Sequence, residues 1–210
     1  MCSHFEAPNA DRLKKAFGRV PTQQYQLDVW PTYSSAFVTP GGAGEQPQIR
    51  VGMFGLLPHW AADKKLARRT YNARSETVAS KPSFRSAWSR GQRCIIPATA
   101  IYEPDWNSGK AIPARISRSD GGLLLIAGLW EQWKGEGEDV VESFTMLTVN
   151  ADDHPLMKRF HRPEDEKRMV VMLPSSKISL WLGGSTADAQ KLLTQYPAEK
   201  LTSSCEPDGA

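Results

Sequence analysis

The sequence predicts an α+β fold in which short helices flank curved, mainly antiparallel β-sheets. Six runs of the chain combine apolar, β-branched and aromatic residues at lengths typical of strands. Glycine-rich or acidic turns separate several of these runs at distances that suit hairpins. Strands and helices do not alternate regularly along the chain, which disfavours a doubly wound parallel sheet.

The expected elements follow one another along a single domain, residues 1–200. A helix is predicted over residues 9–17, with Asn9 as its N-cap, and a short strand over residues 35–39 within a loop rich in proline, glycine and glutamine. The apolar strand runs lie at residues 49–57, 93–103, 112–117, 123–133, 143–150 and 168–173. Turns are expected at residues 40–47, 117–122 and 134–140, and further short helices at residues 63–69, 81–88, 175–182 and 187–195. Residues 201–210 are polar and are expected to form a disordered tail.

Charge and composition indicate an ordinary soluble protein. The chain has 26 Lys and Arg against 23 Asp and Glu, a net charge of +3 that does not by itself predict nucleic-acid binding but allows a local basic groove. No run reaches the roughly 18 apolar residues of a membrane span, and the N-terminal residues lack the apolar core of a signal peptide. We therefore expect a cytoplasmic location and no membrane partner.

The cysteine and histidine patterns predict neither disulfides nor a metal. Cys2, Cys94 and Cys205 are widely spaced and odd in number, so they form no disulfide framework. No C-x-x-C or H-x-x-x-H spacing is present. No nucleotide or flavin motif is present either, and we expect no metal and no cofactor.

Cys2 is the first candidate for chemistry. Removal of Met1 is expected because cysteine is small, and it would leave Cys2 with a free α-amine next to its thiol. The amine has an ordinary pKa of about 7.7–8.0 and the thiol one of about 8.5. Such a 1,2-aminothiol traps aldehydes, since the amine forms an imine on which the thiol closes a thiazolidine ring. Taken alone, however, position 2 is more simply a place that merely tolerates cysteine.

Three further segments carry candidate side chains. Residues 70–78 (TYNARSETV) include Asn72, which can donate and accept hydrogen bonds, and Arg74, which suits a phosphate, although the segment could equally be an N-capping turn. Glu103 ends an apolar strand, where it could transfer protons or simply face water. His154 and His161 lie among arginines and could shuttle protons or belong to a solvated basic loop. Four aromatic residues lie near prolines or basic residues and could stack on unpaired bases, although most of the seven tryptophans suit a core: Trp30, Trp60, Phe84 and Trp88.

Together and in this order, these segments resemble the SOS response-associated peptidase (SRAP) family, from Met1 to about Leu182. The motifs that carry the resemblance are Met1-Cys2, FGLLPHW, NARSET, PSFR, RCIIP, Tyr102-Glu103, AGLWE, and His161 ahead of RMVVML. The resemblance implies a single SRAP domain that senses abasic sites in single-stranded DNA and cross-links to them through the N-terminal cysteine. The thiazolidine adduct protects the strand in the DNA damage response. Peptidase activity that removes Met1 and a lyase activity are associated expectations.

The resemblance also implies roles for individual residues. Cys2 would be the nucleophile and Asn72 would hold it with the sugar, while Glu103 and His161 would transfer protons at the amine, the sugar ring and the thiazolidine. The expected DNA contacts are phosphate contacts by Arg74, Arg85 and Arg162, stacking by Pro31, Trp60 and Phe84, and further contacts by Thr148 and His4. The expected partner is abasic single-stranded DNA, bound by a monomer that is nucleoid-associated when on DNA.

The chain departs from the family pattern at three places. His4 stands where arginine is common, which leaves its phosphate contact open, and Pro104 follows Glu103 where tryptophan is common. The segment RPEDEK separates His161 from Arg168, so either Arg162 or Arg168 could take a phosphate. Two other functions stay open: a cysteine peptidase with a Cys2 thiolate and His161 as base, and a non-covalent single-strand binding module.

Overall fold

Two β-sheets dominate the computed structural model, which describes residues 2–42, 44–135 and 140–205. The strands are β1 (His4–Glu6), β2 (Asp28–Val29), β3 (Ser34–Thr39), β4 (Gln48–Phe54), β5 (Asn72–Arg74), β6 (Arg93–Ala98), β7 (Ala100–Asp105), β8 (Ile112–Arg118), β9 (Leu124–Lys134), β10 (Val140–Asn150), β11 (Arg168–Val170) and β12 (Leu201–Cys205). The helices are α1 (Ala10–Phe17), α2 (Arg85–Ser89), α3 (Ile178–Gly183) and α4 (Thr186–Lys191), with 3-10 helices η1 (Lys64–Arg69), η2 (Met157–Arg159), η3 (Ser175–Lys177) and η4 (Ala198–Lys200).

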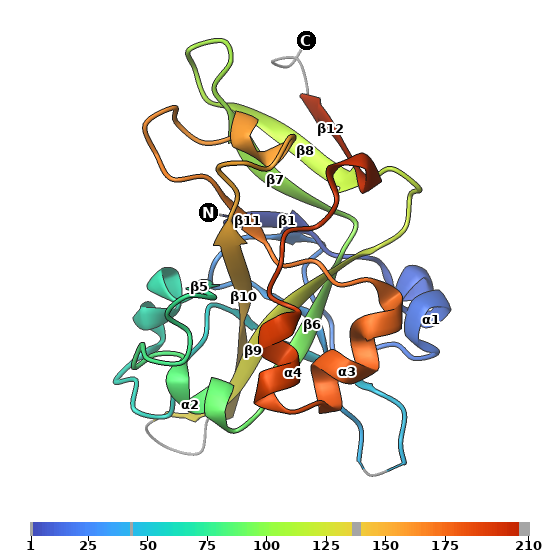
Figure 1. Ribbon diagram of the computed structural model, residues 1–210. Coiled ribbons are helices and arrows are strands. Elements are labelled where there is room, and N and C mark those ends of the chain that lie inside the picture. Colours follow the sequence, from blue (N-terminus) through green and yellow to red (C-terminus); the bar gives the residue numbers. More distant parts are fainter. Residues whose placement is uncertain (1, 43, 136–139, 206–210) are drawn as a thin grey trace.

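The larger sheet closes on itself as a small barrel. Its strands follow the order β10-β4-β3-β6-β9, and β9 pairs with β10 again, while β5 and β11 add to β10. The second sheet has the order β12-β8-β7-β1-β2 and projects beyond the barrel (Figure 1). Only the pairings of β10 with β4 and β5 are parallel among the named strand pairs, so the predicted mainly antiparallel α+β fold is confirmed.

Closure of the barrel requires a glycine in β9. A Cβ atom built on Gly128 would lie 2.5 Å from the carbonyl oxygen of Thr145 on β10 and 2.3 Å from Cδ1 of Ile96 on β6. Both distances are below any van der Waals contact, so a side chain there would push the neighbouring strands apart. The glycine of the AGLWE segment therefore has a packing role in the fold.

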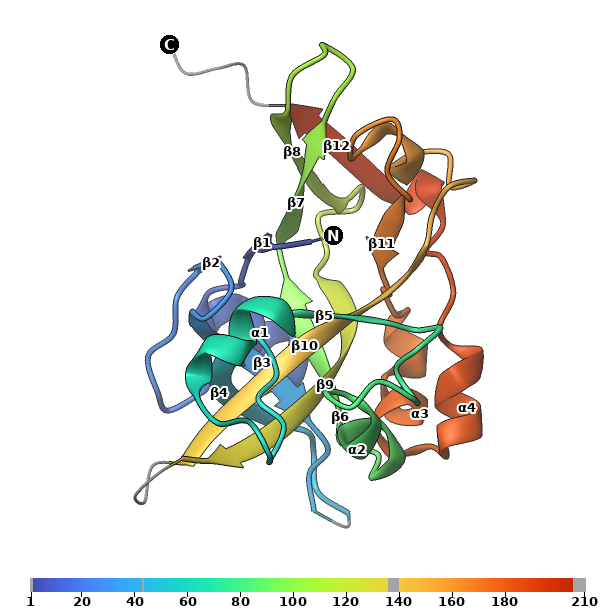
Figure 2. The same ribbon diagram turned by 90° about the vertical axis from the view of Figure 1, so that its left-hand side faces the viewer.

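Phe5 joins the two sheets. It is fully buried in β1, and its ring meets Phe54 of β4 edge-on with centroids 5.3 Å apart, while Phe54 stacks on Phe144 of β10 at 5.5 Å. Complete burial of a phenylalanine side chain contributes roughly 1.5–3 kcal/mol. This contact fixes β1, and with it the adjacent Cys2, at the junction of the two sheets, where β5 also lies (Figure 2).

Several predicted elements are confirmed with adjusted ends. The Asn9 side chain caps α1 by accepting a hydrogen bond from Arg12 N at 3.0 Å, and Gly18 ends the helix with a φ of 72°. The strand predicted over residues 49–57 stops at Phe54, because Gly55 has a φ of 126° and turns the chain. Helix α3 contacts β6 (Figure 2). There Trp181 Nε1 donates to the Cys94 carbonyl at 2.8 Å.

Other expectations were wrong. Residues 201–205 are not disordered: they form β12, because their backbone pairs antiparallel with β8 at the sheet edge. Residues 72–74 form strand β5 against β10 rather than an N-capping turn. Residue 43 of the turn at 40–47, residues 136–139 of the turn at 134–140, and residues 206–210 of the tail lie outside the described residues.

Candidate active site

Cys2 is buried at the junction of the sheets, with 1% of its surface exposed. The Asn72 side chain donates a hydrogen bond from Nδ2 to the Cys2 carbonyl oxygen at 3.0 Å. Asn72 reaches this place because β5 runs parallel to β10 with Asn72 opposite Met146. The NARSET segment therefore contacts the N-terminal segment directly, as the predicted role of Asn72 requires.

Asn72 also has an unused acceptor. Its Nδ2 donates a second hydrogen bond to the Tyr71 carbonyl at 2.8 Å, whereas its buried Oδ1 accepts no hydrogen bond from the described residues. A buried acceptor without a donor is destabilising by about 1–3 kcal/mol. This oxygen is suited to accept a hydrogen bond from a ligand that binds beside Cys2.

Glu103 and His161 form a buried pair near Cys2. His161 Nε2 lies 3.3 Å from Glu103 Oε2, and the two residues are 9% and 2% exposed. Glu103 comes from β7, which pairs with β1, so the pair is held against the strand that follows Cys2. Glu103 is thus buried inside the molecule, and the alternative of a strand end facing water is wrong.

The backbone at His161 is held in an unusual conformation. Its φ is 67°, in the left-handed region that non-glycine residues rarely occupy. The His161 N–H donates to the Pro104 carbonyl at 2.9 Å, and Phe160 forms an isolated bridge with Asp105. These contacts tie the loop to β7 and direct the imidazole towards Glu103.

Burial controls the protonation of this site. It raises the pKa of the Glu103 carboxyl to about 7 and lowers the pKa of the His161 imidazole to about 4. The pKa of the Cys2 thiol is raised far above its ordinary value, first by burial and then by the charge of Glu103. At neutral pH the thiol is therefore protonated, the imidazole is neutral, and Glu103 can both take up and release a proton.

His154 belongs to the core rather than to this site. Its Nδ1 accepts from Met157 N at 3.0 Å and its Nε2 lies 2.7 Å from the Tyr196 carbonyl oxygen. Both ring nitrogens are engaged and the residue is buried, so the solvated basic loop considered for it is wrong.

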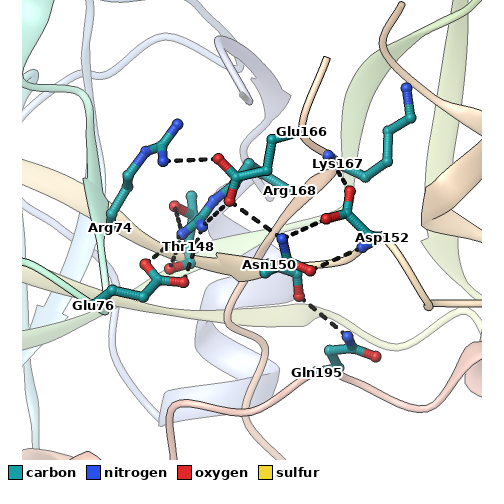
Figure 3. A network of polar contacts seen from close by, with 9 residues as sticks. All are labelled: Arg74, Glu76, Thr148, Asn150, Asp152, Glu166, Lys167, Arg168 and Gln195. Carbon is teal, nitrogen blue, oxygen red and sulfur yellow. Dashed lines mark hydrogen bonds and ion pairs between the residues drawn. The ribbon is translucent and has the colours of Figure 1, made fainter. Parts of the chain in front are cut away.

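The predicted phosphate-binding arginines are exposed. Arg74 pairs with Glu166 at 2.7 Å (Figure 3), and the Arg162 guanidinium lies 5.2 Å from the centroid of the Trp106 ring. Arg85 is exposed at the start of α2. Each of these guanidinium groups is on the surface, where an anionic ligand could approach it.

Arg168, by contrast, is an internal residue. Its guanidinium bonds Glu76 at 2.9 Å and Glu166 at 2.8 Å, and it donates to the carbonyl and hydroxyl oxygens of Thr148 at 2.8 and 3.1 Å (Figure 3). Thr148 is itself buried. Of Arg162, the first residue of RPEDEK, and Arg168, which follows that segment, Arg162 is therefore the accessible one.

The aromatic candidates lie in two environments. Trp60 is 49% exposed, and its Nε1 donates to the Pro82 carbonyl at 3.4 Å, which places it beside the segment that leads to Phe84. Phe84 is buried, and Pro31 is half-buried in a turn. A basic cavity of about 560 Å³ opens next to Trp60, lined also by Lys65, Arg68 and Arg69.

His4 lies in a setting that the sequence did not reveal. Its ring stacks between Trp30 and Tyr102 with centroid distances of 4.0 and 4.2 Å, and its Nε2 is hydrogen-bonded to Asp28. Strand pairing brings these residues together, since His4 is opposite Tyr102 and β2 pairs with β1. No spacing in the sequence signals such a cluster, because its members come from three strands and a turn.

Within residues 2–42, 44–135 and 140–205, no group of three or more His, Cys, Asp or Glu side chains could hold a metal ion. In the same part of the chain, no helix is long and apolar enough to cross a membrane.

Known proteins resemble this chain in sequence and in structure. "Abasic site processing protein YoqW" of Bacillus subtilis is 35% identical over 152 residues, covering 70% of this chain and 64% of that protein. "Abasic site processing protein YoaM" of Bacillus subtilis is 34% identical over 190 residues, covering 86% and 78%. A crystal structure of a protein from Bordetella bronchiseptica superposes with a TM-score of 0.90 at 41% identity, covering 98% of this chain and all of that one. The family model described as SOS response associated peptidase (SRAP) matches residues 1–205, and the chain belongs to this family.

Proposed function

We propose that the protein processes abasic sites in single-stranded DNA by forming a covalent thiazolidine cross-link through Cys2 once Met1 is removed. The observation that carries the proposal is the hydrogen bond from Asn72 to the Cys2 carbonyl, beside the buried Glu103–His161 pair. The relatives named as abasic site processing proteins support the choice of substrate.

The chemistry uses only groups that Cys2 and the DNA supply. The ring-opened abasic deoxyribose carries an aldehyde, and the α-amine of Cys2 adds to its carbon to give a carbinolamine. Loss of water gives an imine. The thiol then adds its sulfur to the imine carbon and its proton reaches the nitrogen, which closes the five-membered ring. No oxidant or reductant is needed.

The surrounding residues have complementary roles. Glu103, with its pKa raised to about 7 by burial, accepts a proton from the amine and returns one when water leaves. Neutral His161 assists the proton transfers of ring opening and ring closure. The free acceptor Oδ1 of Asn72 binds a hydroxyl of the sugar, while Nδ2 holds the backbone of Cys2 in place.

The exposed cations and aromatic rings supply the DNA contacts. Arg74, Arg85 and Arg162 contact phosphates, and Trp60 stacks on a base beside the site. Because the lesion lacks a base, affinity should depend on salt and only weakly on sequence. The other roles expected from the sequence stay predictions: contacts by Pro31, Phe84, Thr148 and His4, a monomeric state, a cytoplasmic location and a lyase activity.

The peptidase alternative is less well supported. An acylating cysteine needs a thiolate, which requires a lowered thiol pKa, whereas burial and Glu103 raise the pKa of Cys2. The imidazole of His161 also pairs with the Glu103 carboxylate at 3.3 Å. A reaction that begins with attack of the α-amine on the aldehyde suits this environment better, because the thiol adds only in the later ring-closing step and does so as a neutral group. Peptidase activity would then be limited to the removal of Met1.

A denaturing gel tests the proposal. Protein whose N-terminal Cys2 has been verified by intact mass is incubated with an oligonucleotide that contains one abasic site. A slower band should form, and it should be absent with Cys2→Ala and with a variant that carries an extra residue before Cys2. Reversible binding without a band would favour the non-covalent module, and turnover of unrelated peptides would favour the peptidase.

A further inference from the structure

An aromatic stack borders the proposed site. Trp30, His4 and Tyr102 lie face to face, with interplanar angles of 15° for the Trp30–His4 pair and 12° for the His4–Tyr102 pair. Trp30 Nε1 donates to Asp28 Oδ2 at 3.2 Å, and the other oxygen of that carboxylate is bonded to His4. One carboxylate thus fixes the indole and the imidazole in the same orientation.

The turn that presents Trp30 is strained. Tyr33 N donates to the Trp30 carbonyl at 2.9 Å, which closes a four-residue turn with Pro31 second and Thr32 third. Thr32 has a φ of 79° at the position where such turns prefer glycine. A β-branched residue in this conformation is unfavourable, and strain of this kind persists where surrounding contacts enforce it, commonly at binding sites.

Trp30 also keeps a large accessible surface. Although His4 covers one of its ring faces, the residue is still 42% exposed. It lines a cavity of about 260 Å³ together with Ser3, His4, Tyr102, Glu103 and Pro104. The same cavity is therefore bordered by the exposed indole and by residue Glu103 of the proposed active site.

The chemistry of the cavity suits a base better than a phosphate. Its lining is mostly aromatic and apolar, and two of its lining residues, His4 and Tyr102, are hydrogen-bonded to the carboxylates of Asp28 and Glu6. Glu6 is already paired with Arg115 at 2.8 Å, so that arginine is engaged. Carboxylates repel a phosphate, whereas the π face of a base stacks on an aromatic ring without needing charge.

We propose that Trp30, held by the His4–Asp28 contact, is the stacking platform for the nucleobase next to the abasic sugar. This inference rests on the proposed function, since it places the abasic sugar at Cys2 and Glu103. Trp30 would then determine which nucleotides next to the abasic site bind well. Purines should be preferred at that position, because their larger rings cover more of the indole.

Non-covalent binding tests the platform separately from the cross-link. The probes are single-stranded oligonucleotides with a tetrahydrofuran abasic analogue, which lacks the aldehyde, and either a normal adenosine or a second tetrahydrofuran as its 5′ or 3′ neighbour. Affinity is measured by fluorescence anisotropy for wild type, Trp30→Ala, Trp30→Phe and Tyr33→Ala. Tyr33 is the matched control, because it is an exposed aromatic of the same turn that does not line the cavity.

We expect Trp30→Ala to weaken binding of the adenosine-flanked probe roughly tenfold on one side of the lesion, with little change when that neighbour also lacks its base. Trp30→Phe should retain most of the affinity and Tyr33→Ala all of it. If Trp30→Ala lowered the affinity equally for every probe, or for none, the proposed stacking role of Trp30 would be wrong. Failure of wild-type protein to cross-link a true abasic site would instead refute the proposed function, because these probes cannot cross-link.

Discussion

Asn72 Nδ2 lies 3.0 Å from the carbonyl oxygen of Cys2, a residue 70 positions away in the sequence. The contact depends on two strand pairings: β5 with β10 for Asn72, and β1 with β7 for the segment after Cys2. Cys2 is thus held by a side-chain amide from a distant segment.

Substitution of Asn72 by Asp should slow cross-linking at least tenfold. The change keeps the size of the side chain but sets a carboxylate oxygen against the Cys2 carbonyl and adds a charge near Glu103. Loss of one orienting hydrogen bond is worth about 1–1.5 kcal/mol, which corresponds to roughly a factor of ten in rate. Single-turnover gel kinetics measure the rate, and a thermal melt checks the fold. A folded variant with the wild-type rate would contradict the role of Asn72.

The cross-linking rate should rise with pH through an inflection near 7. Burial raises the pKa of Glu103 to about 7, so the fraction of carboxylate able to accept the amine proton grows as the pH increases from 6 to 8. In Glu103→Gln this inflection should vanish, leaving only the titration of the α-amine at about 7.7–8.0. Rates measured across this range in buffers of constant ionic strength make the comparison. An unchanged inflection in the variant would assign it to another group.

Substitution of Glu166 by Gln should tighten DNA binding. The Glu166 carboxylate pairs with Arg74 at 2.7 Å and so competes with a phosphate for the Arg74 guanidinium. Because exposed ion pairs contribute only about 0.2–1 kcal/mol, the expected gain is no more than about fivefold at low salt. Glu164→Gln is the matched control, since it changes the net charge equally from the same exposed segment. Equal gains in both variants would mean that overall charge, and not release of Arg74, is responsible.

Substitutions of Arg168 and Arg162 should affect different properties, namely stability and DNA binding. Arg168→Met removes buried charged hydrogen bonds to Glu76, Glu166 and Thr148 and should lower the free energy of unfolding by roughly 2–3 kcal/mol. Arg162→Met changes an exposed side chain and should alter stability by less than about 0.5 kcal/mol while weakening DNA binding. Urea unfolding and anisotropy titrations measure the two quantities. A reversed pattern would assign the phosphate contact to Arg168.

The fold class and most long elements were predictable because their signals are local. The apolar runs around β9 and β10 and the N-cap at Asn9 depend on neighbouring residues alone. Strands β1, β2 and β5 have only two or three residues, and β12 is polar, so pairing partners define them and not composition. Periodicity in a single sequence cannot reveal such partners.

The residues of the candidate site were predictable from the sequence, but the contacts between their side chains were not. Cys2, Asn72, Glu103 and His161 were named from the sequence, and the structure brings them together, while their catalytic roles stay predictions. The stack of Trp30, His4 and Tyr102 could not be foreseen, because it arises where three strands align. The pairing of Arg74 with Glu166 was equally hidden, since it joins β5 to a distant loop.

The left-handed backbone of His161 has a consequence for protein engineering. Glycine or asparagine would adopt its φ of 67° more readily than histidine, so replacing His161 by either should relieve strain while removing the imidazole. A library of variants sorted only for thermal resistance would thus enrich proteins that fold well and have lost the imidazole to which we assign proton transfer. Under the proposed function, selection for stability would favour glycine or asparagine at this position, whereas selection for DNA capture would favour histidine.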